Sequence, residues 1–347
     1  MAADAGARNL SPASGRSRLD EDDVRVRPGR GSRPRTRRRP AHEDAADAFV
    51  TGVDRGRYRC WTGDHVVTAM KARELGRGGV VVGDRVRLAG DVTGAPGTLA
   101  RVVQVQPRTS VLRRSADDDE PVERIIVANA DQLVIVTALA NPPPRPRLID
   151  RFLVAAYDAG IEPLLCLTKS DLAAPDDLIA AYEPLGIRFI VSGRPLGPAL
   201  DDLRAVLAGR LSVMVGHSGV GKSTLVNALV PEAERAVGSV SSVTGRGRHT
   251  SSSAVALPLP GDDDGWIIDT PGLRSFGLAY VTPDRVVSAF PEFADALAEC
   301  QSGCTHIEAD CALDEWAAAH GGSARARLDS LRRVLRSQEG LDPEGSP

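Results

Sequence analysis

Between residues 48 and 113 the chain alternates short apolar stretches with turn residues. Period-two alternation and branched apolar residues are typical of strands with one buried face. Several such strands in one short region, with many arginines, favour a small closed barrel of the OB type. A barrel of this kind can bind RNA or serve protein contacts, and the pattern leaves both open. The expected strands cover residues 58–61, 65–68, 84–88 and 99–105.

From about residue 125 to residue 280 the pattern changes, because near-continuous apolar runs alternate with helical periodicity. Strand–helix alternation predicts an α/β domain whose parallel sheet is covered on both faces. The expected strands are 133–137, 163–167, 188–191 and 211–215, and the expected helices are 148–159, 176–182, 199–207 and 222–229.

The region from about residue 283 is predicted to be mainly helical. Ser323 is a candidate N-cap for a final basic helix. Leucines at core spacing predict its buried face, and arginines between them are expected to point largely outward. The leucines are Leu328, Leu331 and Leu335, and the arginines are Arg325, Arg332, Arg333 and Arg336.

The composition of the first residues predicts a disordered N-terminal tail. Residues 1–45 are rich in Gly, Pro, Ser, Arg and Asp, so they are predicted to be disordered. Eight arginines and no acid fall within residues 25–39, although the whole chain has a net charge of -3. This stretch either adds electrostatic affinity for RNA or is a solvated extension without a role.

Neither a membrane protein nor an exported protein is expected. Apolar runs such as residues 132–136 are too short to cross a bilayer. The first residues also lack the apolar core of a signal peptide.

The sharpest motif matches G-x-x-x-x-G-K-[ST] between an expected strand and an expected helix. Its glycines let backbone N–H groups face phosphate oxygens at a helix N-terminus. Lys222 is expected to neutralise the β- and γ-phosphates, and the Ser223 hydroxyl to ligate Mg²⁺. The predicted nucleotide-binding residues here are Gly216, His217, Ser218, Gly219, Val220, Gly221, Lys222, Ser223 and Thr224.

A second motif, D-x-x-G, ends the apolar segment that begins at Ile267. Asp269 is expected to hold Mg²⁺ through a water molecule, and the Gly272 N–H to face the γ-phosphate. Alone, this sequence also fits a plain turn. Its distance of about 50 residues from the phosphate loop favours the nucleotide role.

A third motif, Thr168-Lys169-Ser170-Asp171, resembles the [NT]-K-x-D sequence of GTPases. Asp171 would accept hydrogen bonds from the guanine ring N–H and amine, a donor pair that adenine lacks. Lys169 would lie along the base, and Ser192 would sit in the loop that contacts the guanine carbonyl. An ATP-dependent enzyme with the same phosphate loop is the rival interpretation.

Lysine usage supports these assignments. Of 43 basic residues only Lys71, Lys169 and Lys222 are lysines, and two of them fall in nucleotide motifs. In an arginine-biased chain, lysine is expected mainly where a compact ammonium group is needed.

The order of the motifs is unusual, since the base-reading motif precedes the phosphate loop. All these loops are expected at the same strand ends of one sheet, so circular permutation preserves the site. The switch segments then lead directly into the C-terminal region.

A Cys/His cluster follows, with Cys300, Cys304, His306 and Cys311 inside a dozen residues. Three thiolates and one imidazole are the ligand set of a closed, structural zinc site, and unbound reduced cysteines are the alternative. Cys60 and Cys166 lie in expected strands and are predicted core residues.

The permuted motif order, the preceding barrel and the following cluster together resemble the RsgA (YjeQ) family of ribosome-dependent GTPases. The resemblance implies a cytoplasmic, monomeric GTPase that binds GTP/GDP, Mg²⁺ and one Zn²⁺. It further implies action late in maturation of the 30S ribosomal subunit, on 16S rRNA, with no role for DNA or a membrane. Slow hydrolysis stimulated by the subunit is expected, followed by release. The predicted domains are a tail (1–45), an OB-like barrel (46–115), a permuted GTPase domain (120–282) and a helical zinc domain (283–340).

The resemblance also implies catalytic residues. The segment from Gly245 to Ser251 resembles the family's switch sequence, G-R-H-T-T, with Ser251 in place of the second threonine. His249 is therefore the candidate that orients water. Thr250 is favoured over Ser251 as the second Mg²⁺ ligand. Leu273 stands where many GTPases have a water-orienting glutamine, and leucine cannot orient water. His249 can alternatively contact RNA or be a solvent-exposed loop residue. Leu273 also keeps open a nucleotide-regulated RNA-binding scaffold with little hydrolysis.

Overall fold

The computed structural model describes residues 44–76, 79–117, 120–231, 254–261, 265–270, 281–308 and 311–339. The predicted disordered tail lies outside these residues, except for its last two positions. Within the described part, no helix is long and apolar enough to span a membrane.

Five strands close into the predicted barrel. Their order is β1-β2-β3-β5-β4, and pairing of β4 with β1 completes the closure. Alternate residues such as Val50, Cys60 and Val67 are fully buried inside it. Each expected strand overlaps an observed one, while β1 was not specified from the sequence. The strands are β1 (Ala46–Asp54), β2 (Arg57–Trp61), β3 (Val66–Lys71), β4 (Arg85–Gly90) and β5 (Ala100–Val105).

A hairpin that the sequence did not predict follows the barrel. It pairs β6 (Val111–Asp117) with β7 (Glu120–Ala128) in antiparallel register. Its charged residues interrupt the apolar alternation by which strands are recognised.

The central sheet confirms the predicted α/β pattern. Five strands run parallel in the order β10-β9-β8-β11-β13, and β12 pairs antiparallel to β13 at the edge. A single pair, Gly52 with Val255, joins β12 to β1 of the barrel. The strands are β8 (Gln132–Ala138), β9 (Glu162–Thr168), β10 (Arg188–Val191), β11 (Leu211–Val215), β12 (Val255–Pro258) and β13 (Trp266–Asp269).

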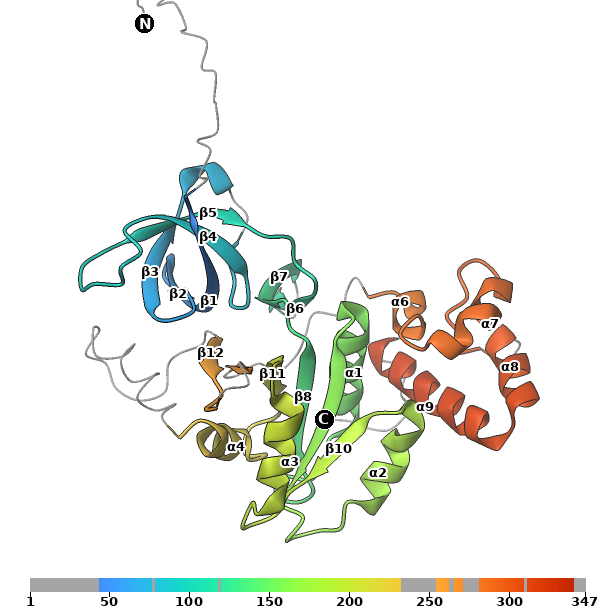
Figure 1. Cartoon of the computed structure of the whole chain (residues 1–347). Helices are drawn as coiled ribbons and strands as arrows, with labels where there is room; N and C mark the ends of the chain where they lie inside the picture. The colour runs from blue at the N-terminus through green and yellow to red at the C-terminus, as the bar shows by residue number, and fades with distance from the viewer. Residues whose placement is uncertain are drawn as a thin grey trace, which may run out of the picture. The chain divides into compact units, whose positions relative to one another are not determined.

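Helices cover both faces of this sheet (Figure 1). Leu133 and Ile135 of β8 share a core with the first helix, whereas Val134 and Val136 share a core with the third and fourth. This alternation along one strand explains its continuous apolar sequence. The helices are α1 (Pro146–Ala159), α2 (Asp176–Tyr182), α3 (Pro198–Leu207) and α4 (Lys222–Leu229).

The C-terminal region is helical, as predicted, and its core is continuous with that of α1. Leu328, Leu331 and Leu335 are buried there, as expected. Ser323 is not an N-cap, because the last helix already begins at Gly322. The helices are α6 (Pro283–Val287), α7 (Ala294–Glu299), α8 (Ala312–His320) and α9 (Gly322–Glu339), and short 3₁₀ turns occur at Arg73–Leu75, Glu183–Leu185 and Pro291–Phe293.

Candidate nucleotide and metal sites

The phosphate-loop motif forms the turn between β11 and α4. Gly216 and Gly221 have φ angles of 156° and 95°, which favour glycine. A Cβ atom on Gly216 would also collide with the Val136 carbonyl oxygen. Ser223 and Thr224 are exposed in the first turn of α4. The loop therefore presents backbone and hydroxyl groups at a helix N-terminus, where anions bind well.

Lys222 and Asp269 meet in this site. Their side chains form an ion pair between the start of α4 and the end of β13. The lysine side chain is only 13% exposed. Thr270 donates from Oγ1 to the Met214 carbonyl at 2.9 Å, which ties the end of β13 to β11. The two predicted phosphate and magnesium residues are thus adjacent, although 47 positions separate them in sequence.

The Thr-Lys-Ser-Asp motif braces the phosphate loop from the end of β9. Thr168 Oγ1 donates to the Val220 carbonyl at 2.5 Å. Lys169 Nζ donates to the Gly219 carbonyl at 2.9 Å and to the Asn141 carbonyl. Sequence reasoning missed Asn141, because only the fold brings the β8–α1 loop to this lysine.

Asp171 is exposed beside the loop that follows β10. The Arg194 N–H donates to Asp171 Oδ1 at 3.0 Å, and the Ser170 N–H donates to the Ser192 carbonyl at 3.1 Å. The structure therefore brings Ser192 to the motif that contains Asp171, at the same sheet edge as the phosphate loop.

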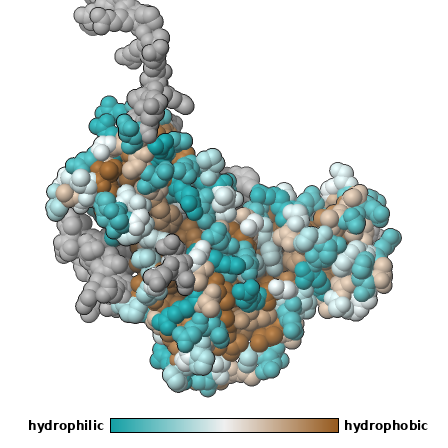
Figure 2. All heavy atoms as spheres, in the orientation of Figure 1, coloured by the Kyte–Doolittle hydropathy of each residue, from teal (hydrophilic) through white to brown (hydrophobic). Residues whose placement is uncertain are grey.

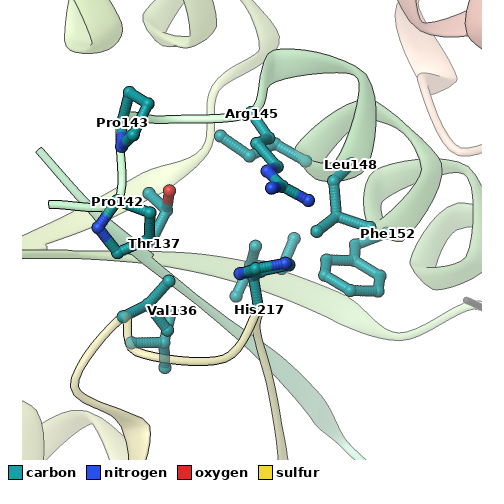
Figure 3. A pocket seen from close by; sticks show the side chains of 11 residues that line it. Val136, Thr137, Pro142, Pro143, Arg145, Leu148, Phe152 and His217 are labelled. Atoms are coloured by element: carbon teal, nitrogen blue, oxygen red, sulfur yellow. The ribbon is translucent and has the colours of Figure 1, made fainter. Parts of the chain in front are cut away.

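His217 has a different environment from its neighbours in the loop. Its ring lines a small hollow between β8 and α1, with Arg145, Leu148 and Phe152 around it (Figure 3). Its Nδ1 lies 2.9 Å from the Ser218 carbonyl oxygen. Mainly apolar residues of β8 and α1 thus line the hollow that the His217 ring faces.

Three predicted residues, His249, Thr250 and Gly272, lie outside the described residues. Their roles stay predictions.

The four predicted metal ligands gather in one cluster, with all ligand atoms within 4.8 Å of one another. Cys300 Sγ lies 3.6 Å from Cys311 Sγ, and His306 Nδ1 lies 3.6 Å from both sulfurs. Zinc bond lengths in a tetrahedron imply separations of about 3.8 Å between two sulfurs and about 3.6 Å between sulfur and nitrogen. The donor set and its spacing therefore fit a tetrahedral metal ion.

The cluster's surroundings also suit thiolate ligands. The His306 N–H lies 3.3 Å from Cys304 Sγ, in position to donate to a thiolate. Burial raises the pKa of the Cys304 and Cys311 thiols. A bound cation acts in the opposite direction, since coordinating thiols lose their protons. Cys60 and Cys166, by contrast, are buried core residues, as predicted.

Arg332 corrects one sequence prediction, because it points inward and its side chain is only 6% exposed. Its guanidinium binds both carboxylate oxygens of Asp314 at 2.8 and 2.6 Å. It also donates to the His306 and Glu308 carbonyls at 3.0 and 2.9 Å. Arg333 is likewise only partly exposed, since it packs over the Tyr182 ring. Arg332 therefore ties α9 and α8 to the loop that carries His306.

Replacing Arg332 by alanine is expected to destabilise the protein by about 3 kcal/mol, because a buried ion pair loses one partner and two carbonyls lose their donor. Arg325→Ala is the matched control: Arg325 also binds Asp314, at 3.0 Å, but is 54% exposed, so its loss should cost under about 1 kcal/mol. Chemical denaturation followed by circular dichroism checks this difference. Equal effects of the two substitutions would contradict it.

The spatial arrangement defines a class of protein. The phosphate loop follows the central strand β11, Asp269 ends the neighbouring strand β13, and the Thr-Lys-Ser-Asp motif begins at the last residue of β9. This is the arrangement of a P-loop GTPase, except that the motif similar to [NT]-K-x-D precedes the phosphate loop in the chain. The protein is a circularly permuted GTPase.

Known proteins agree with this class. Residues 105–279 match the family model described as RsgA GTPase. The small ribosomal subunit biogenesis GTPase RsgA of Pseudomonas aeruginosa (strain LESB58) is 43% identical over 249 residues, which cover 70% of this chain and 72% of that protein. Its namesake from Gemmatimonas aurantiaca is 40% identical over 264 residues, covering 74% and 83%. The chain belongs to the RsgA GTPase family.

Two solved structures share the fold. The crystal structure of YjeQ from Thermotoga maritima matches with a TM-score of 0.61 and 26% identity, covering 85% of this chain and 99% of that one. YloQ, described as a circularly permuted GTPase, matches with a TM-score of 0.61 and 21% identity, covering 89% and 100%. These comparisons confirm the resemblance, the predicted fold class and the GTP-hydrolysing activity, and they do not favour the non-hydrolysing scaffold.

Proposed function

We propose that this GTPase acts in late maturation of the 30S ribosomal subunit, where it binds 16S rRNA and leaves after GTP hydrolysis. The strongest support is its similarity to proteins named small ribosomal subunit biogenesis GTPase. The site is consistent with this proposal, since the braced phosphate loop and the base-reading motif lie at one sheet edge. A role in maturation of the ribosomal subunit implies a cytoplasmic location, and we propose that the protein acts there as a monomer.

The role that we propose for each residue at the nucleotide follows from the chemistry of its side chain. Lys222 neutralises the β- and γ-phosphates, and Asp171 selects guanine. Ser223 and Thr250 hold Mg²⁺, with Asp269 acting through its water. The ion supplies charge neutralisation on the phosphates. His249 orients the attacking water, since Leu273 has no group that can do so.

The proposed metal in the Cys/His cluster is one structural Zn²⁺. Four protein ligands leave no open position for catalysis, so the ion stabilises the loop from Cys300 to Cys311. This loop has no helix or strand of its own between α7 and α8 in the described residues. Its ordering is expected to depend on the metal.

The barrel is the proposed rRNA contact. Hydrophilic residues cover much of its visible face (Figure 2). Exposed arginines of the barrel give phosphate groups several cationic partners; they include Arg55, Arg57, Arg73, Arg85 and Arg101. GTP would favour the docked state through the switch segments, and hydrolysis would weaken it.

Phosphate release from GTP and ATP, with and without purified 30S subunits, tests the proposal. We expect slow GTP turnover that rises at least about tenfold with subunits, because docking completes the site, and little ATP turnover. 50S subunits are the matched control. Equal GTP turnover with 30S, with 50S and without subunits would refute the proposed partner while leaving the GTPase assignment intact.

A further inference from the structure

His306 makes contacts through both ring nitrogens. Nδ1 lies 3.6 Å from the sulfurs of Cys300 and Cys311, and Nε2 lies 2.8 Å from Asp284 Oδ1. The histidine is 1% exposed. A carboxylate that accepts a hydrogen bond from Nε2–H keeps the proton on Nε2, and this leaves the Nδ1 lone pair facing the thiols. This is the tautomer that a metal ligand requires.

Asp284 lies in α6, which contacts two parts of the molecule through consecutive residues. Asp284 binds His306 of the cluster, whereas Arg285 binds Asp158 at the end of α1. Arg285 Nη1 lies 3.0 Å from the Asp158 carboxylate, and Nη2 donates to the Asp158 carbonyl at 3.0 Å. Val286 and Val287 are fully buried beneath them. Helix α6 is thus held to the metal cluster through Asp284 and to α1, which covers one face of the GTPase sheet, through Arg285.

We propose that Asp284 is a positioning residue of the metal site, which orients His306 and couples metal binding to α6. The inference rests on the proposed metal site. Its physical basis is that a carboxylate bonded to the remote ring nitrogen fixes the tautomer and raises the basicity of the ligating nitrogen. Because α6 is also held to α1, metal binding stabilises the contact between the cluster and the GTPase domain.

The side chain of Asp284 is 79% exposed, so its replacement leaves no buried charge behind. Asp284→Ala is expected to weaken Zn²⁺ binding 10- to 100-fold, measured by competition with a chromophoric chelator. Asp284→Asn is expected to weaken it less, because its amide oxygen can still accept a hydrogen bond from Nε2–H. Asp295→Asn, an exposed carboxylate on α7, is the matched control and should bind zinc like the wild type.

Histidine ¹⁵N NMR of the zinc-loaded protein gives a second measurement, the protonation and exchange of the His306 ring nitrogens. This measurement would not change if Asp284 had only a structural role. In the wild type we expect a metal-bound Nδ1 and a protonated Nε2 whose proton exchanges slowly with water. In Asp284→Ala that proton should exchange faster.

Unchanged zinc affinity and unchanged exchange in Asp284→Ala would overturn the inference. If Asp284→Ala fails to bind a fluorescent GDP analogue and is therefore misfolded, Asp284→Asn decides by the same two measurements. A wild type that binds no zinc would overturn both the metal assignment and this inference. GTP turnover with 30S subunits, measured on the same preparations, reports the proposed ribosomal function separately.

Discussion

Replacing Lys222 by alanine is expected to lower GTP turnover at least about 100-fold, because the principal cation of the phosphate loop disappears. The lysine is mostly buried and paired with Asp269. Without its ammonium group, the Asp269 carboxylate and the phosphates repel one another without compensation. Both the affinity for GTP and the rate of single-turnover hydrolysis should fall. A quenched single-turnover assay with radiolabelled GTP, repeated over a range of protein concentrations, measures both quantities.

Lys71→Ala is the matched control for this prediction. Lys71 ends β3 in the barrel, outside the nucleotide motifs, so basal turnover without subunits should not change. Lys222→Arg separates charge from shape, because a guanidinium keeps the charge but does not fit the space of an ammonium. Turnover of Lys222→Ala within threefold of the wild type would contradict the assignment.

The nucleotide site could be predicted from sequence because its chemistry is local. Each motif is a short run at a strand end, and parallel strands place those ends at one edge. The strands at Arg188–Val191 and Leu211–Val215 and the helices at Asp176–Tyr182 and Lys222–Leu229 have the predicted bounds. Glycines at fixed offsets and an apolar strand specify the loop without any distant partner.

The residues that the sequence did not reveal depend on distant partners. Helical periodicity predicts an outward Arg332, yet its guanidinium is buried because Asp314 and two carbonyls, 18 to 26 positions away, satisfy it. From the sequence alone, Asp284 is an ordinary acidic residue in the first turn of a helix. Only the fold shows that it lies next to His306. Local patterns carry no information on such pairings, since tertiary packing creates them.

Asp171→Asn is expected to reduce the preference for GTP over ATP at least about 100-fold. A carboxylate offers two acceptors to the guanine ring N–H and amine, whereas an amide offers one acceptor and one donor. One guanine donor would then face another donor, and a site built for hydrogen bonds rejects such mismatches strongly. Xanthine carries a carbonyl where guanine has the amine, so the same variant should gain affinity for XTP. Direct titration with fluorescent ribose-labelled analogues of GTP, ATP and XTP measures all three affinities without relying on a guanine probe.

Asp177→Asn, an exposed acid in the first turn of α2, is the matched control and should keep the wild-type preference. The gain in affinity for XTP is more informative than the loss of affinity for GTP, because a damaged loop would lower the affinity for every nucleotide alike. Asp171 also accepts the Arg194 N–H, which asparagine's oxygen can still do, so the loop after β10 should keep its position. An Asp171→Asn protein with unchanged GTP preference would mean that another residue reads the base. Equal losses for GTP and XTP would mean that Asp171 supports the loop but does not recognise guanine.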